Sequence, residues 1–283
     1  MAHVILFPDE LAQQQAWGVF LACGCVGELG DAPAFCREFL PRFILLTAGF
    51  DRFIAAVKDQ QIQLAGIVKY RPPGTECPEA GAPDPQWKAI FGNIRAESLS
   101  PSITDQGKLR ITISVEKSLG SVIPLAARLI RGASYRPEVP ILAFEEDHRL
   151  IVISPREIVI SRADDLMDFW IMLRTTVDFI CEAHRYRFTV RPETAARMGV
   201  GATEIFRRLP GINCGRCGSQ SCMEFASGLM TGKRVLGDCE PLFEESDPRY
   251  LASINWLLHV LGIPEHEPVS TDGRRGSSPV LGL

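Results

Sequence analysis

The spacing of apolar residues in the first 70 positions predicts a mixture of helices and strands. Residues 8–30 repeat apolar side chains at helical spacing, between an acidic start signal and a glycine-containing end, so one amphipathic helix is predicted there. A second helix is predicted over residues 34–39. Residues 44–56 are apolar in a pattern that fits either helix or strand, whereas residues 63–70 favour a strand.

The clearest patterns lie between residues 108 and 180. Residues 108–115 alternate apolar and polar side chains, which predicts a strand with one buried face. A helix is predicted over 122–130, and a longer one from Asp164–Asp165 to at least Phe179. Three short apolar runs with turn residues between them predict an antiparallel meander over 140–145, 150–154 and 157–161.

Changes in composition divide the chain. Residues 71–86 hold five prolines and two glycines, so a loop is predicted there. Residues 1–188 are predicted to form an α+β domain with an antiparallel sheet, whose role the sequence leaves open. Helical signals that resume at Pro192 predict a small, mostly helical domain over 190–264. The polar, Gly/Ser-rich residues 267–283 are predicted to be a disordered tail.

Charge and hydropathy narrow the class of protein. The formal net charge is −4 over 283 residues, which gives no electrostatic reason to expect a nucleic-acid partner. The longest apolar runs fall short of the ~20 residues of a membrane-spanning helix, and the N-terminus lacks the basic region of a signal peptide. The sequence therefore predicts a cytoplasmic protein without membrane insertion.

The cysteines supply the strongest chemical signal. The chain has nine, of which three form a C-x2-C-x4-C run and a fourth follows after sixteen intervening residues. In a chain without a secretion signal, such clustering favours metal or redox chemistry over disulfides. The predicted ligands are Cys214, Cys217, Cys222 and Cys239.

The residues between these cysteines suit a ligand loop. Gly211, Gly215 and Gly218 can adopt positive φ without steric cost, which lets the backbone wrap tightly around a bound group. A helix predicted over 223–234 would return the chain to the site and deliver Cys239. A structural zinc site is the alternative, although such sites usually have two C-x2-C pairs and only one is present.

Positive side chains near the cysteines could offset the negative charge of a thiolate-bound cluster if they face it. Otherwise they are solvated surface residues. The candidates are Arg207, Arg208, Arg216, Lys233 and Arg234.

This segment resembles a known family. It is similar to the four-cysteine [4Fe–4S] domain of the corrinoid iron–sulfur protein large subunit and to a module of the Rnf complex B subunit. The resemblance covers about residues 205–243 and differs in place, because the module lies near the N-terminus of those proteins. The matching residues are Leu209, Pro210, Gly211, Asn213, Cys214, Gly215, Cys217, Gly218, Cys222, Phe225, Ala226, Asp238, Cys239, Pro241 and Leu242.

The resemblance implies one [4Fe–4S] cluster held by the four cysteines and used for single-electron transfer in anaerobic redox metabolism. It also implies a redox protein partner, with a corrinoid protein as the candidate. We expect an electron-transfer protein or accessory subunit rather than a stand-alone enzyme, and no catalytic residue is predicted. Two alternatives stay open: a redox enzyme subunit with a substrate or cofactor site in the N-terminal domain, and a structural or regulatory metal-binding protein.

The remaining cysteines give weaker signals. Cys23, Cys25 and Cys36 could suggest a second metal site, but the C-x-C pair on a predicted helix favours core packing, since cysteine behaves as a small apolar residue. Cys181 continues an apolar helix face and is predicted to lie in the core. Cys77, in the proline-rich loop, is predicted to be an exposed thiol whose role the sequence leaves open.

Overall fold

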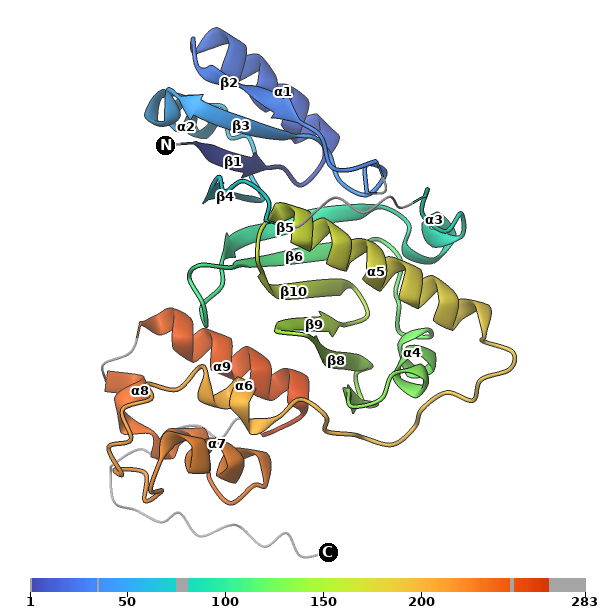
Figure 1. The fold of residues 1–283 in the computed structure, drawn as a ribbon, viewed down its shortest axis with the longest axis vertical. Helices are drawn as coiled ribbons and strands as arrows, with labels where there is room; N and C mark the ends of the chain where they lie inside the picture. Colours follow the sequence, from blue (N-terminus) through green and yellow to red (C-terminus); the bar gives the residue numbers. More distant parts are fainter. Residues whose placement is uncertain (1, 35, 75–80, 245–246, 265–283) are drawn as a thin grey trace, which may run out of the picture. The chain divides into compact units, whose positions relative to one another are not determined.

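The computed structural model describes residues 2–34, 36–74, 81–244 and 247–264, so Cys77 and the predicted tail over 267–283 lie outside the described residues. The chain divides into two compact units, Met1–Gly201 and Ala202–Leu283 (Figure 1). The division falls later than the sequence boundary placed near residue 189.

The first half of unit 1 packs two helices against four strands. The predicted helix over 8–30 is wrong in its second part, because the helix ends at Ala22. Gly24, with a φ of 60°, then turns the chain into an edge strand. Residues 36–39 form turns instead of the predicted helix. The elements are β1 (His3–Leu6), α1 (Glu10–Ala22), β2 (Val26–Gly30), β3 (Phe43–Ala48), α2 (Phe50–Asp59) and β4 (Gly66–Lys69).

The second half of unit 1 confirms the predicted strand, meander and long helix. Strands β8, β9 and β10 pair antiparallel in sequence order, with Phe144 opposite Ile151 and Val152 opposite Val159. The elements are α3 (Trp87–Phe91), β5 (Ile94–Pro101), β6 (Leu109–Val115), α4 (Ile123–Leu129), β7 (Ser134–Arg136), β8 (Ile141–Glu146), β9 (Arg149–Ile153), β10 (Glu157–Ala163) and α5 (Leu166–Arg185).

All ten of these strands form one mixed sheet, in the order β2-β3-β1-β4-β5-β6-β10-β9-β8-β7. The pairs are antiparallel except for β4 and β5, which meet in parallel at Gly66 and Leu99. A side chain at Gly66 would overlap the carbonyl oxygen of Leu99, so only glycine allows the two halves to join there. The α+β class with a largely antiparallel sheet is confirmed.

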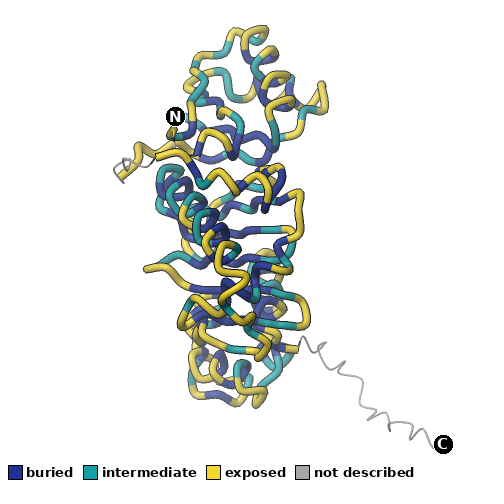
Figure 2. Tube along the Cα trace, turned by 90° about the vertical axis from the view of Figure 1, so that its right-hand side faces the viewer, coloured by how far each residue is buried: buried dark blue, intermediate teal, exposed yellow. Residues whose placement is uncertain are grey.

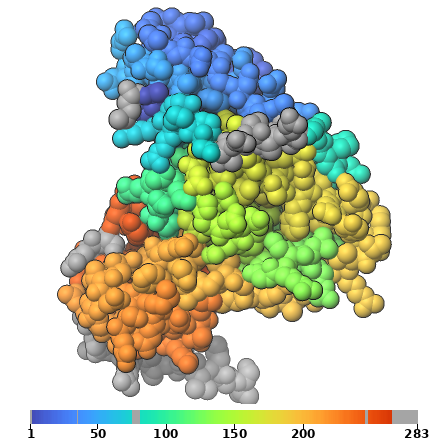
Figure 3. All heavy atoms as spheres, viewed as in Figure 1, coloured from blue at the N-terminus to red at the C-terminus, as the bar shows by residue number. Residues whose placement is uncertain are grey.

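Helix α5 covers one face of the sheet. Asp165 caps it by accepting a hydrogen bond from the Asp168 backbone N–H, as the sequence predicted for this start. Phe169, Leu173 and Val177 are fully buried in the core that also holds the inward side chains of β6 and β10. Figure 2 colours the buried residues dark blue, and Figure 3 shows α5 (yellow) beside the α4 region (green) on one face of this unit.

The segment after α5 explains the later boundary. Tyr135 and Arg197 exchange two backbone hydrogen bonds, at 2.6 and 2.9 Å, and the Arg197 guanidinium donates to the carbonyls of Ala127, Ile130 and Ala133. These contacts are non-local, so the helical signals seen from Pro192 could not reveal them. No helix forms between Arg185 and Ala202.

Unit 2 is helical, with elements α6 (Ala202–Phe206), α7 (Cys222–Met230), the 3₁₀ turn η1 (Leu236–Asp238), α8 (Glu240–Glu244) and α9 (Pro248–Leu261). Its core is formed by side chains such as Ile205, Phe225, Leu229 and Leu257. Among the described residues, no helix of either unit combines the length and apolarity that crossing a bilayer requires.

Candidate metal centre

The loop that precedes α7 is built from residues in left-handed conformations. Gly211, Gly215 and Gly218 have φ values of 71°, 73° and 73°, so the positive φ predicted for these glycines is confirmed. Gly218 donates its N–H to the Gly215 carbonyl at 2.9 Å, which closes a tight turn that carries Cys217. Asn213 also has a positive φ, of 49°, and precedes Cys214 directly.

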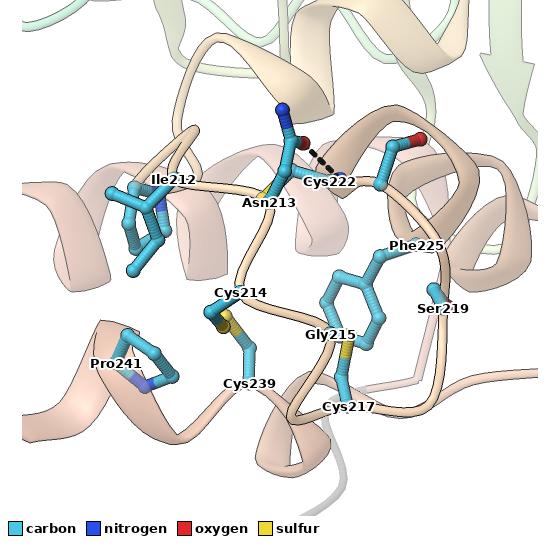
Figure 4. Close-up of a pocket in the computed structure, with 12 residues that line it drawn as sticks. Ile212, Asn213, Cys214, Gly215, Cys217, Ser219, Cys222, Phe225, Cys239 and Pro241 are labelled. Carbon is cyan, nitrogen blue, oxygen red and sulfur yellow. Dashed lines mark hydrogen bonds between the residues drawn. The ribbon is translucent and has the colours of Figure 1, made fainter.

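Helix α7 starts at the third cysteine of the run. The Ser221 side chain caps the helix by accepting from the Glu224 N–H at 3.1 Å. Asn213 Oδ1 accepts a hydrogen bond from the Cys222 N–H at 2.8 Å, drawn as a dashed line in Figure 4. The helix ends at Met230, four residues before the predicted end, because Gly232 has a φ of 69° and reverses the chain.

The chain after α7 returns the fourth cysteine. The 3₁₀ turn η1 ends at Asp238, directly before Cys239, and the Asp238 carboxylate accepts a hydrogen bond from the Val235 N–H at 3.3 Å, which stabilises the turn. The predicted return of Cys239 to the first three cysteines therefore takes place, through a 3₁₀ turn instead of a longer helix.

All four cysteines border one pocket, which is partly open to solvent. Figure 4 shows the Phe225 ring directed into the same space. The pocket is lined by Pro210, Ile212, Asn213, Cys214, Gly215, Cys217, Ser219, Ser221, Cys222, Phe225, Cys239 and Pro241.

Exposure differs among the four thiols. Cys222 and Cys239 are buried, at 9% and 6% exposed, whereas Cys217 is half-buried and Cys214 is exposed. The pKa of Cys239 is raised to about 11, chiefly by burial and also by the charges of the other three thiols, against a lowering by the Leu242 N–H. The thiols are therefore close enough to interact electrostatically, and one edge of the group faces solvent.

The four sulfurs are spread more widely than ligands of one ion. Among the described residues, three ligand atoms lie within 4.8 Å of one another only in the set His148, Asp164 and Asp168 of unit 1, so no three cysteine sulfurs do. Two thiolates on a tetrahedral zinc ion would lie about 3.8 Å apart, given a Zn–S bond of about 2.3 Å.

The His148 set has a different character, because its carboxylates are already paired with cations. Asp168 accepts from the Arg149 guanidinium at 2.8 Å through both oxygens, and Asp164 contacts Lys108 Nζ at 2.8 Å. A metal ion would have to displace these cations. We interpret the set as an ion-pair network at the start of α5.

The basic residues near the cysteines fall into two groups. Arg207 and Arg208 both bind Glu204, at 2.6 and 3.1 Å, so their charges are engaged inside the helical unit. Arg216 lies within the cysteine loop and pairs with Glu244 at 3.3 Å. Arg234 donates to the Gly218 carbonyl at 2.7 Å. Of the expected basic residues, Arg216 therefore belongs to the cysteine loop and Arg234 contacts it.

The other described cysteines do not join this site. Cys36 is buried and donates its thiol hydrogen to the Trp170 carbonyl at 3.1 Å, and Cys181 is buried in the same core cluster. Burial raises the pKa of Cys181 to about 12. Cys23 and Cys25 are half-buried against the separate cluster between α1, α2 and the sheet, so they share no site with Cys36.

Comparisons with known proteins identify the segment. A family described as "Putative Fe-S cluster" matches residues 209–241. The acetyl-CoA decarbonylase/synthase complex subunit gamma of Methanosarcina acetivorans is 41% identical over 56 residues, which are 19% of this chain and 12% of that relative. The corrinoid/iron-sulfur protein large subunit of Moorella thermoacetica is 43% identical over 42 residues, 15% of this chain and 9% of that relative.

A third relative, the subunit gamma of the same complex from Archaeoglobus fulgidus, is 36% identical over 59 residues, 20% of this chain and 13% of that relative. The chain thus spans only about a tenth of the length of these relatives. No solved structure matches the chain. The likeness lies in the iron–sulfur region, and residues 209–241 are accordingly an iron–sulfur cluster segment similar to that of these two kinds of protein.

Proposed function

We propose that this protein binds one [4Fe–4S] cluster and transfers single electrons to or from a protein partner. The observation that carries the proposal is the convergence of four cysteines, from a loop, a helix start and a 3₁₀ turn, on one pocket within the segment that matches an iron–sulfur family. The proposed ligands are Cys214, Cys217, Cys222 and Cys239.

The donor set and its spacing favour a cubane over a single ion. Each iron of a [4Fe–4S] cluster takes one thiolate, so the four sulfurs surround the inorganic core instead of sharing one metal. Among the described residues, no three cysteine sulfurs lie within 4.8 Å of one another, as ligands of a single zinc ion would, and this supports the cluster.

The arrangement of burial supports an electron-transfer role. When bound, such a cluster accepts and releases one electron at a time. Cys222 and Cys239 would lie on the protein side, and the exposed Cys214 would lie on the solvent side. A partner docked over Cys214 would therefore be the nearest acceptor or donor.

The identity of the relatives suggests the partner. Two kinds of relative share the segment, and the name of one includes a corrinoid group, so we propose a redox protein partner in anaerobic metabolism, with a corrinoid protein as the first candidate. Unit 1 would supply a docking surface.

Anaerobic purification, followed by assays of iron, acid-labile sulfide and zinc, tests the cofactor. We expect about four irons and four sulfides per chain and an EPR signal after one-electron reduction. Cys217→Ala should abolish that signal. Cys23→Ala removes a half-buried cysteine outside the site and should leave iron content and signal unchanged.

Other outcomes would select the alternatives. One zinc per chain, with loss of fold on chelation, would replace the proposal by a structural metal site. A bound organic cofactor in purified protein would indicate a redox enzyme subunit. Full iron content in Cys217→Ala would contradict the ligand assignment.

A further inference from the structure

Helix α7 ends in a way that turns the following residues back along its own surface. Lys233 donates its N–H to the Gly228 carbonyl at 2.9 Å, and Gly232 donates to Leu229 at 3.2 Å, the hydrogen-bond pair of a Schellman motif. The left-handed Gly232 makes this reversal possible. The next residue, Arg234, consequently starts beside the helix and not beyond its end.

Two glycines leave room for the Arg234 side chain. A Cβ at Gly228 would lie 2.6 Å from Arg234 Cγ, and a Cβ at Gly218 would lie 3.2 Å from its Nη2. Glycine inside a helix costs about 1 kcal/mol relative to alanine, so Gly228 weakens α7 while admitting the arginine. The side chain therefore runs across the Gly228 face of α7 to the cysteine loop.

At the far end, the guanidinium contacts the turn that carries a proposed ligand. Arg234 Nη2 donates to the Gly218 carbonyl at 2.7 Å, and the N–H of the same Gly218 closes the turn onto Gly215. Arg234 thus connects the end of α7 to the turn around Cys217. Without this bond, the turn would be held by its own backbone hydrogen bond and by the bound group.

The charge of Arg234 is also placed differently from its neighbours. Arg216 is paired with Glu244, whereas Arg234 donates to a neutral carbonyl, and no carboxylate of the described residues forms an ion pair with it. A cluster with four thiolates is anionic and gains a further negative charge on reduction. A nearby positive charge therefore stabilises the reduced state more than the oxidised state.

We propose that Arg234 is a positioning residue that holds the Cys217 turn against α7 and raises the reduction potential of the bound cluster. This inference rests on the proposed cluster. The side chain touches the loop and not the reacting atoms, so it acts through the Cys217 turn and through its charge.

The test compares Arg234→Gln with Lys233→Gln in the full chain, purified anaerobically. Lys233 is the adjacent, exposed cation, so its variant removes the same charge without removing the contact to Gly218. We expect Arg234→Gln to shift the midpoint potential to more negative values in an EPR-monitored titration. At a fixed potential its ratio of reduced to oxidised cluster should fall on the order of threefold, and that of Lys233→Gln should fall less.

Gly228→Ala supplies a second, independent variant. Alanine favours the helix, so propensity alone predicts a more stable unit 2. The added Cβ displaces Arg234 without changing the net charge, so we expect faster loss of iron to a chelator and faster amide hydrogen exchange over residues 215–218.

A potential for Arg234→Gln equal to that of Lys233→Gln, with full iron in both, would overturn the inference. If Arg234→Gln cannot hold its cluster, Gly228→Ala and Arg234→Lys are measured in its place. Midpoint potentials and amide exchange rates equal to those of the wild type in both of these variants would equally overturn the inference. A wild-type protein without a reducible cluster refutes the proposed function instead. In that case, unchanged amide exchange over 215–218 in Arg234→Gln also refutes the claim that Arg234 holds the Cys217 turn, while faster exchange supports that claim.

Discussion

Asn213 and Cys222 are nine positions apart in the chain, yet the Asn213 side-chain oxygen accepts the backbone N–H of Cys222 at 2.8 Å. This N–H belongs to the first turn of α7, where no carbonyl of the helix can accept it. Asn213 also adopts a φ of 49°, which asparagine tolerates better than most residues. Asn213 therefore sets the path of the loop into Cys214 through its backbone and the position of Cys222 through its side chain.

Replacing Asn213 should separate these two roles. Asn213→Gly keeps the positive φ and removes the hydrogen bond, so we expect a loss of about 1 kcal/mol in the free energy of unfolding. Asn213→Ala removes the same hydrogen bond and keeps a Cβ in the left-handed conformation without the polar side chain by which asparagine tolerates it, so it should lose about 1 kcal/mol more than Asn213→Gly. Denaturant unfolding of the cluster-loaded protein, with iron release to a chelator as a second readout, measures both. Equal losses for the two variants would contradict the role of φ.

The Arg208 side chain should be the main polar contributor to the stability of unit 2. It is 2% exposed and bonds Glu204 at 3.1 Å and Ser253 Oγ at 3.0 Å, which links α6 to α9. Arg208→Met removes a positive charge that compensates the fully buried Glu204 carboxylate, so we expect the free energy of unfolding to fall by about 3 kcal/mol. Arg207→Met removes the half-exposed partner of the same carboxylate and should cost at most about 1 kcal/mol. Denaturant unfolding would disprove the assignment if both losses were alike.

Thiol alkylation should follow burial in the cluster-loaded protein. At pH 8 we expect the half-buried Cys23 to react, and Cys36 and Cys181 to stay unmodified. Because burial raises the pKa of Cys181 to about 12, raising the pH to 10 should not expose its thiolate while the protein stays folded. After removal of the metal, the exposed Cys214 should react first among the site cysteines. Peptide mass spectrometry reads each site, and early alkylation of Cys181 would contradict its placement.

The ion pairs around Asp164 should make unit 1 sensitive to acid. Burial raises the pKa of this carboxyl, but the Lys108 hydrogen bond and the charges of His148, Lys108 and Arg149 outweigh it, so the net shift is downward. A carboxyl whose pKa is lowered by folding stabilises the folded state at pH values above its ordinary pKa of about 4. This stabilisation is lost as the pH falls through the folded pKa. Asp164→Asn should therefore be less stable at pH 7 and lose less on acidification, which thermal unfolding between pH 7 and 3 would measure. An unchanged pH profile would contradict the pairing.

Local patterns were sufficient for a large part of this protein. The meander over β8–β10 and the start of α5 at Asp165 were predictable, because strand alternation, turns and helix caps act over a few residues. The cysteine quartet was visible for a related reason. Its spacing and its glycines are local, and the three glycines have the positive φ that the loop requires.

Elements whose stability comes from distant partners were missed. Residues 26–30 continue a helical apolar pattern, but they form β2 because β3 offers a strand to pair with. The boundary at Gly201 depends on Arg197 pairing with Tyr135, more than sixty positions earlier. A helical signal at Pro192 has no access to that pairing energy.

By itself, the sequence determined which atoms could bind a metal and that the backbone beside them could turn sharply, because residue type and spacing set both. Only the tertiary structure decided which charges accompany those atoms. Arg208 is held by Glu204 and Ser253 and Arg216 by Glu244, while Arg234 reaches Gly218 across Gly228. These arginines look alike in sequence, and long side chains acquire a partner only when packing excludes water and presents one.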